Sequence, residues 1–239
     1  MLMFFLLPPQ LAWAQPLPAI DLQIQPTDDP ARVVDTVKLL VLLTMLSLIP
    51  AFLLMMTSFI RIVIVLSLLR SALGIPQTPP NQVIIGLALF LTIYVMSPVF
   101  NQVNDEAIQP YINNEVSQEE FFELASDPLR DFMAKHTREK DLALFVNMSG
   151  MDQPANVSEV PLTVFIPAFV ISELKTAFQM GFLLYVPFLV IDMVVASTLM
   201  SMGMFMLPPV IVSLPFKLLL FVMVDGWYLV IKSLMESFA

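Results

Sequence analysis

The sequence predicts an all-α integral membrane protein made of kinked hydrophobic helical hairpins, with about four principal helices. Hydrophobic residues make up 58% of the 239 residues and charged residues only 13%, whereas soluble domains have about 45–50% and about 25%. The apolar residues form long charge-free runs at 39–60, 71–104 and 193–216. Each run is long enough for the roughly 20 apolar residues that a membrane-crossing helix needs. The 20 prolines predict kinks or breaks in these helices.

The composition also argues against an enzyme. The absence of cysteine excludes disulfides and thiol chemistry, and the single histidine, His136, argues against a zinc site. The sequence has no glycine-rich phosphate loop and no histidine near a nucleophile. We therefore expect no catalytic activity, no cofactor, no bound metal and no nucleic-acid partner.

Residues 1–14 resemble a short signal peptide. Their apolar stretch is followed by Ala12-Trp13-Ala14, which predicts cleavage between Ala14 and Gln15. The first residues lack Lys or Arg, so an uncleaved amphipathic start is the alternative. Residues 15–38 are expected to form an extended lead.

The first helical hairpin is predicted over residues 39–103, with a basic loop at 61–82. This loop contains Arg61 and Arg70 and no acidic residue, which favours the cytoplasmic side. We expect the two arginines to reach toward the membrane edge.

An acidic domain is predicted over residues 104–159. It holds twelve acidic and four basic residues, a balance of −8 that accounts for nearly all of the chain's net charge of −9. The stretch 116–133 is helix-like, and Ser117 with Glu120 predicts a capping box at its start. A signal peptide followed by a cytoplasmic loop places this domain in the periplasm.

The second helical hairpin is predicted over residues 160–239, and charges interrupt its apolar segments. A charge at the bilayer centre costs at least about 2.5–3.5 kcal/mol, so these groups should pair between helices or between subunits. Lys217 and Asp225 are eight residues apart, which would place them on nearly the same helix face. The alternative is a proton or ion path. The interrupting residues are Glu173, Lys175, Asp192, Lys217 and Asp225.

A methionine-rich loop is predicted at residues 200–209, where methionine occupies every second position from Met200 to Met206. Gly203 and the Pro208-Pro209 pair oppose a regular helix there. Methionine is flexible and polarisable, so such a loop could seal a pore inside an assembly. The alternative is simple apolar packing at a helix turn.

Two long strings carry a resemblance to a known family. They are MTSFIRIVIVLSLLRSALGIPQTPPNQVIIGLALFLTIYVMSPV at 56–99, and MGMFMLPP at 202–209 followed by FKLLLFVMVDGW at 216–227. Together they closely resemble the FliP family, the P subunits of the flagellar type III export gate, over nearly all of residues 30–238. Related subunits of virulence injectisomes share both signatures, but the signal peptide and the acidic insertion favour the flagellar branch.

The resemblance implies a non-enzymatic pore subunit in the basal body at the bacterial inner membrane. Five copies are expected to assemble with the Q and R subunits into a helical ring, partly lifted toward the periplasm. The ring would work with the A and B components of the export apparatus and pass unfolded rod, hook and filament proteins.

The family also implies a role for the methionine loop, which narrows the pore in its members. The resemblance assigns this pore gasket to Met202, Met204, Phe205 and Met206, where Phe205 stands in place of a methionine found in many relatives. Two alternatives remain: a small proton-coupled transporter that uses Asp192 and Asp225, for which we see no internal repeat, and a structural scaffold that lines no channel.

Overall fold

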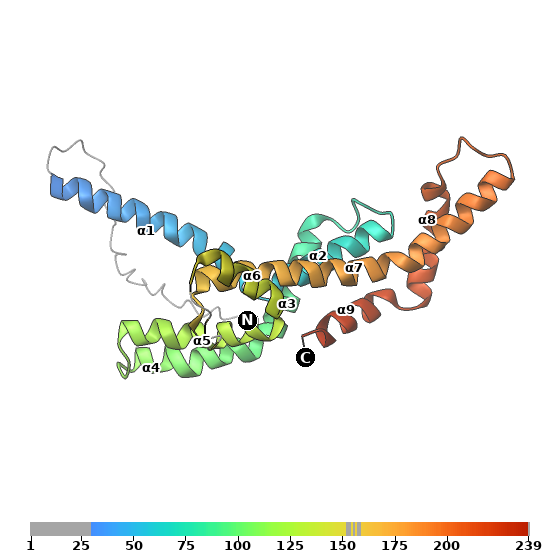
Figure 1. The fold of residues 1–239 in the computed structure, drawn as a ribbon. Coiled ribbons are helices and arrows are strands. Elements are labelled where there is room, and N and C mark those ends of the chain that lie inside the picture. The colour runs from blue at the N-terminus through green and yellow to red at the C-terminus, as the bar shows by residue number, and fades with distance from the viewer. Residues whose placement is uncertain (1–29, 152–153, 155, 157–158, 239) are drawn as a thin grey trace, which may run out of the picture. The chain divides into compact units, whose positions relative to one another are not determined.

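A computed structural model describes residues 30–151, 154, 156 and 159–238 of the chain. The expected signal peptide, its cleavage between Ala14 and Gln15, and residues 15–29 of the expected lead lie outside the described residues. Every regular element in the described part is a helix, as the hydropathy pattern predicted (Figure 1). The chain divides into two compact units, residues 1–47 and 48–239.

The first unit contains the start of helix α1 (Pro30–Met55). Residues 30–38 were expected to be extended, but they belong to this helix. Proline is well tolerated at the first position of a helix, and no further proline or glycine occurs before Pro50. The helix therefore begins at Pro30 and continues directly into the apolar segment.

The second unit contains the remaining helices. They are α2 (Phe59–Ala72), α3 (Asn81–Val103), a π-helical turn (Asn104–Ile108), α4 (Gln109–Ile112), α5 (Gln118–His136), α6 (Glu139–Ser149), α7 (Leu162–Ser201), α8 (Pro209–Met223) and α9 (Gly226–Glu236).

Helix α2 replaces most of the basic loop that was expected at residues 61–82. The connection between α2 and α3 is only the turn at 73–80, where Gly74 has a positive φ of 78°. Residues 62–69 are almost entirely apolar, and α2 buries them against α3 and α7. Burying this apolar surface lowers the free energy of the fold, whereas a loop would leave it in contact with solvent. This difference explains why the segment is helical.

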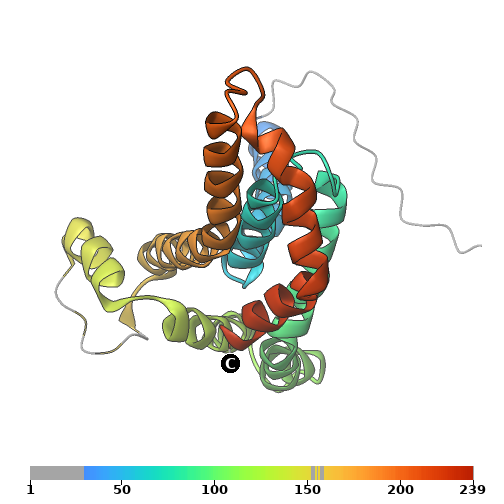
Figure 2. The same cartoon turned by 90° about the vertical axis from the view of Figure 1, so that its right-hand side faces the viewer.

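Helix α7 is the central element of the second unit. It contacts α2, α5, α6 and α8, and Figure 2 shows α2 between α7 and α3. At Gly181, α7 and α2 approach so closely that a Cβ atom on this residue would lie 2.2 Å from Cδ1 of Leu68. This glycine sets the crossing distance of α2 and α7.

Two hydrophobic cores hold the helices together. The first joins α2 to α3, α7, α8 and α9 through residues such as Leu66, Ala88 and Leu234. The second joins the end of α3 to α5, α6 and the start of α7 through residues such as Met133 and Phe169. The acidic region is therefore packed against the membrane-type helices rather than tethered to them.

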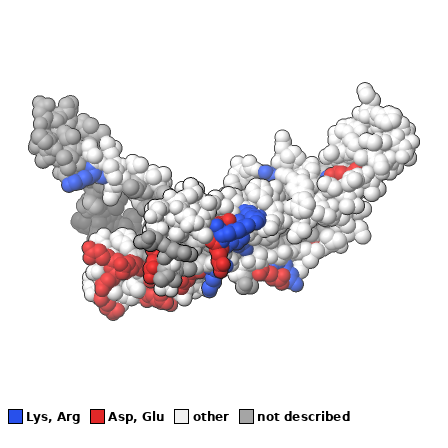
Figure 3. Space-filling view, viewed as in Figure 1, with Lys and Arg blue, Asp and Glu red and all other residues white. Residues whose placement is uncertain are grey.

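The region expected to be the acidic domain contains the π-helical turn and helices α4 to α6. The capping box at its main helix is confirmed: Oγ of Ser117 accepts from N–H of Glu120, and the Glu120 carboxylate accepts from N–H of Ser117. Figure 3 shows acidic side chains gathered over α4 and α5.

Two of the described helical stretches, Asn81–Ile112 and Leu162–Ser201, are long and apolar enough to cross a membrane. The pair α8 and α9, bent by 64°, would make a third span if counted together. The membrane character agrees with the sequence prediction, but the expected count of about four principal helices is not confirmed. Prolines 50, 98, 167, 187 and 215 all lie inside helices.

Candidate functional site

The methionine-rich loop is a compact turn at residues 202–208, joining α7 to α8. Gly203, with φ of 75°, ends α7: its N–H donates to the carbonyl of Met200, and N–H of Met204 donates to the carbonyl of Leu199, each at 3.0 Å. This pair of bonds is the Schellman arrangement that glycine favours after a helix. Pro208 then precedes α8, which begins at Pro209.

The apolar side chains of this turn are exposed. Phe205 is 78% exposed and Met206 is 96% exposed, while Met202 and Met204 are also on the surface. Burying a side chain of this size contributes about 1.5–3 kcal/mol, and the turn forgoes much of this gain within the described part of the chain. Within the described residues, the chain itself leaves the apolar surface of this turn uncovered.

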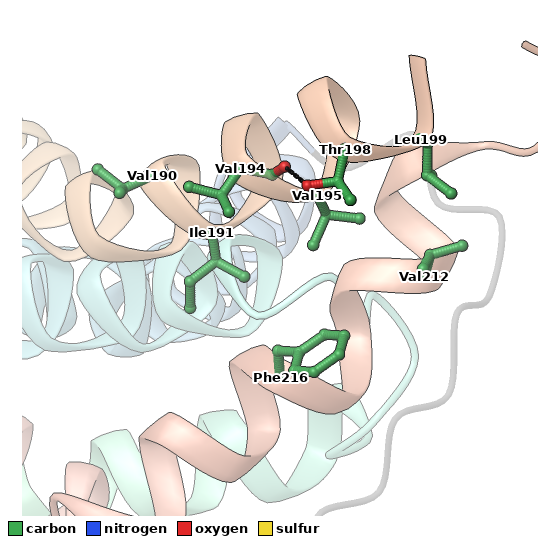
Figure 4. Close-up of a pocket in the computed structure, with 8 residues that line it drawn as sticks. All are labelled: Val190, Ile191, Val194, Val195, Thr198, Leu199, Val212 and Phe216. Atoms are coloured by element: carbon green, nitrogen blue, oxygen red, sulfur yellow. Dashed lines mark hydrogen bonds between the residues drawn. The ribbon is translucent and has the colours of Figure 1, made fainter. Parts of the chain in front are cut away.

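Beneath the turn, α7 and α8 form an apolar groove of about 470 Å³ (Figure 4). Its one polar side chain is Thr198, whose hydroxyl donates to the carbonyl of Val194 at 2.8 Å. None of the residues that line the groove has a titratable side chain. Its lining residues are Val190, Ile191, Val194, Val195, Thr198, Leu199, Val212 and Phe216.

A polar cluster fastens α8 to the rest of the fold below this groove. Nζ of Lys217, buried on α8, lies 2.7 Å from Oδ2 of Asp192 on α7 and donates to the carbonyl of Ala72 at the end of α2, at 3.3 Å. The Ser213 hydroxyl donates to Oδ1 of Asp192 at 2.5 Å. Three helices thus meet at one ammonium group, and the base of the methionine turn is fixed.

A second ion pair joins α2 to the middle of α7. Nε of Arg61 lies 2.9 Å from Oε2 of Glu173, and its Nη2 lies 2.5 Å from Oε1. Its Nη1 donates to the carbonyl and hydroxyl of Ser237, and its guanidinium lies 3.9 Å from the ring centroid of Phe238. The bidentate geometry is the strong form of a charge-assisted contact.

This arrangement corrects two sequence expectations. Arg61 does not reach toward a membrane edge, because it is only 3% exposed and is neutralised by Glu173. Glu173 was expected to pair with another of the charges that interrupt the second hairpin, but Arg61 of α2 binds both of its oxygens. Arg70 also stays within the fold, donating to the carbonyl of Pro79 and to the side chain of Asn81.

The remaining two charges of the predicted set are exposed. Among the described residues, neither Lys175 nor Asp225 has an ion pair. Asp225, with φ of 51°, lies at the bend between α8 and α9. Helix α8 ends at Met223, so the eight-residue helical spacing from Lys217 to Asp225 does not apply.

Sequence reasoning missed the neutral members of these clusters. Ser213 lies four residues before Lys217 on α8, a spacing that places both side chains on one helix face. That spacing was a usable signal. Nothing local pointed to Ser237 or Phe238 as partners of Arg61, since 176 positions separate Ser237 from Arg61.

His136 lies at the boundary between the acidic region and the Arg61 cluster. Its ring contacts Phe132 and Phe238 at centroid distances of 4.8 and 5.3 Å. Burial, followed by the positive charges of Arg61 and Lys135, lowers the pKa of His136 from 6.5 to about 4. The imidazole is therefore neutral at pH 7.

The Asp141 carboxylate ties α6 to α7. Burial alone would raise its pKa, but hydrogen bonds from Ser172 and Arg138 outweigh this effect and hold the pKa of Asp141 below its usual value. Across the described residues, no three side chains of the metal-binding types form a group that could hold an ion. The site as a whole is an apolar surface held in place by buried ion pairs.

The chain was compared with known proteins. The model of the FliP family matches residues 42–234. The chain is 59% identical over 212 residues to the flagellar biosynthetic protein FliP of Bacillus subtilis, covering 89% of this chain and 96% of that protein. It is 52% identical over 224 residues to the protein of the same name from Aquifex aeolicus, covering 93% and 92%. The chain is 55% identical over 226 residues to the flagellar biosynthetic protein FliP of Pectobacterium carotovorum, covering 95% of this chain and 87% of that protein.

Proposed function

The chain belongs to the FliP family, and from this premise we propose that it is a non-enzymatic core subunit of the flagellar type III protein export gate. In this role it forms part of the channel through which unfolded rod, hook and filament proteins cross the inner membrane. Relatives that share most of this chain's length carry the name of a flagellar biosynthetic protein, which supports the flagellar branch over the injectisome branch.

One observation carries the channel part of the proposal. The apolar turn at 202–208 is exposed, yet its base is fixed by Gly203 and by the contact of Lys217 with Asp192. An exposed apolar surface on a firmly held support is the arrangement that a gasket needs. Methionine side chains have three rotatable bonds and adapt to differently shaped neighbours, so they can close around one another and then around a passing polypeptide.

The sealing side chains are Met202, Met204, Phe205 and Met206. Closed at rest, they exclude water and ions from the channel. An unfolded substrate displaces them without any sequence-specific contact, because dispersion contacts and burial of apolar surface are non-directional. The channel therefore accepts many different exported proteins.

Assembly of several copies supplies the cover that the apolar surfaces lack in one chain. Phe90 on α3, Met193 on α7 and Val222 on α8 are all strongly exposed. We assign five copies to a ring with the Q and R subunits, next to the A and B components. Asp225, exposed and without an ion pair among the described residues, is placed at a contact between subunits.

The location follows from the same proposal. The ring lies in the inner membrane at the flagellar basal body, with the region of α4 to α6 on the periplasmic side. A proton-coupled transporter is disfavoured, because Lys217 and Ser213 bind both carboxylate oxygens of Asp192. These contacts give the Asp192 carboxylate a structural role, joining α7 to α8.

The seal is tested by replacing two methionines in the assembled complex. Met204→Ala together with Met206→Ala shortens two of the four sealing side chains, so we expect greater leakage of small ions or solutes through the resting complex. Met148→Ala and Met223→Ala remove exposed methionines on α6 and α8, outside the turn, and serve as controls. Conductance unchanged from the wild type in the double variant would refute the seal.

A further inference from the structure

A cluster of positive side chains lies where α6 meets α7, apart from the acidic surface of α4 and α5 (Figure 3). N–H of Arg138, at the start of α6, donates to the Ser172 hydroxyl of α7 at 3.1 Å. Arg138 and Lys140 therefore lie close to Lys175, which is one helical turn after Ser172. Two acidic residues also lie here: Asp141, which already binds Arg138 and Ser172, and Glu139, between Arg138 and Lys140. The cluster therefore keeps a net positive charge.

Bringing these cations together is unfavourable unless an anion joins them. Lys140 and Lys175 are both exposed, and within the described ranges no carboxylate forms an ion pair with either. Both ammonium groups are thus open to solvent near the contact of α6 with α7. An anion with several oxygens, such as a phosphate group, could accept from both.

An apolar groove begins at the same lysine and follows the exposed face of α7. It has a volume of about 420 Å³ and is lined by Lys175, Phe178, Gln179, Phe182 and Leu183. These positions follow the spacing of a single helix face. From Lys175 to Leu183 the groove extends over eight residue steps, about 12 Å at 1.5 Å per residue. This length approaches the thickness of one hydrocarbon leaflet, about 15 Å.

We propose that this surface binds one anionic phospholipid, with its phosphate between Lys140 and Lys175 and an acyl chain along Phe178, Phe182 and Leu183. The charge at one end and the apolar groove beyond it match the two halves of such a lipid. A helix long and apolar enough to cross a membrane presents both parts.

A carboxylate from a second copy is the competing occupant. It would neutralise the two lysines, but a carboxylate alone leaves the groove of Phe178, Phe182 and Leu183 uncovered. A lipid satisfies both features with one molecule and is present wherever a membrane helix lies. The site is far along α7 from the methionine turn, so it does not depend on the export role.

The test measures which lipids remain with the purified full-length protein in a mixture of phosphatidylcholine and phosphatidylglycerol. We expect the wild type to enrich phosphatidylglycerol. Lys140→Gln with Lys175→Gln should lower this enrichment by about fivefold for each cation removed. Lys232→Gln, which removes an exposed lysine of α9, should leave it unchanged.

A second variant tests the groove separately from the charge. Leu183→Gln keeps both lysines and should weaken retention of long-chain phosphatidylglycerol while leaving a short-chain analogue unaffected. Equal amounts of the two lipids on the wild type would overturn the proposal. Displacement of the lipid by inorganic phosphate alone would also overturn it. The same holds if the double lysine variant retains the enrichment but assembles differently, because the lysines would then contact a second copy.

Discussion

The buried pair of Arg61 and Glu173 gives a quantitative prediction for stability. Glu173→Gln keeps the size of the side chain but removes its charge. The guanidinium of Arg61, 3% exposed, would then remain buried with no carboxylate beside it. Its bonds to Ser237 and its contact with Phe238 do not supply a negative charge.

The size of the effect follows from the cost of an uncompensated buried charge. Removing one partner of a buried ion pair destabilises a protein by about 3–5 kcal/mol. The glutamine oxygen still accepts one hydrogen bond from Arg61, so we expect a loss near the lower limit, about 3 kcal/mol. That is a large share of a total stability of about 5–15 kcal/mol.

Replacing both partners should restore most of the loss. In Arg61→Met with Glu173→Met, two apolar side chains of similar length fill the space, a change that is often neutral or stabilising for buried pairs. The double variant should therefore be more stable than Glu173→Gln alone, although the carbonyl of Ser237 loses its donor.

Unfolding of the purified protein in detergent, followed by circular dichroism, measures these differences. Lys232→Gln is the control, since the pair of Lys232 and Glu236 is exposed and 3.8 Å apart and should contribute less than about 1 kcal/mol. If Glu173→Gln destabilises the protein no more than this control does, the buried pair does not have the role described.

Three further predictions concern packing, the second ion pair and pH. Gly181→Ala places a Cβ 2.2 Å from a leucine of α2 and should lower the free energy of unfolding by about 1–3 kcal/mol. Gly86→Ala, with open space around it, should be neutral or stabilising. Equal unfolding midpoints for the two variants would contradict this prediction. Asp192→Asn leaves buried Lys217 without its counter-charge and should lower the unfolding midpoint. The effect should be smaller than that of Glu173→Gln, because the Asp192 side chain is 31% exposed. An unchanged midpoint would show that the pair of Asp192 and Lys217 does not stabilise the fold. The pKa of His136 is about 4 in the fold, against an ordinary value of 6.5. As pH falls from 6.5 to 4, the unfolded chain is protonated first, so the free energy of unfolding decreases over this range. His136→Gln should reduce this decrease, and a pH profile identical to that of the wild type would exclude the histidine as its cause.

Local features of the fold were predictable because their signals lie within a few residues. The capping box at Ser117 and Glu120 depends only on residues three apart. The irregular turn at the methionines depends on Gly203 and on the proline pair that follows it. In both cases hydrogen bonds or backbone angles within a few residues determine the local structure.

Partners of the buried charges were not predictable in the same way. Arg61 and Glu173 are 112 positions apart, and no periodicity links them. In the sequence Arg61 lies beside a charge-free stretch, which favoured a loop at the membrane edge. Only the crossing of α2 and α7, set by Gly181 and the surrounding core, brings the two charges together.

The contact of Lys217 with Asp192 falls between these cases. Sequence reasoning named both residues as candidates because each interrupts an apolar segment. It could not choose among the available acids, since the choice depends on how the α7–α8 turn folds α8 back along α7. The bend after Met223 likewise removed Asp225 from the face that its spacing predicted.

The central claim is that the methionine turn contacts the exported polypeptide, and crosslinking tests it most directly. The chain contains no cysteine, so Met206→Cys introduces a unique thiol at a fully exposed position of the turn. Met148→Cys places a thiol at another exposed methionine, on α6, and serves as the control. With an export substrate stalled in the assembled gate, we predict an adduct at position 206 and none at 148. Absence of any adduct at 206, in cells where that variant still exports the substrate, would contradict the proposed channel.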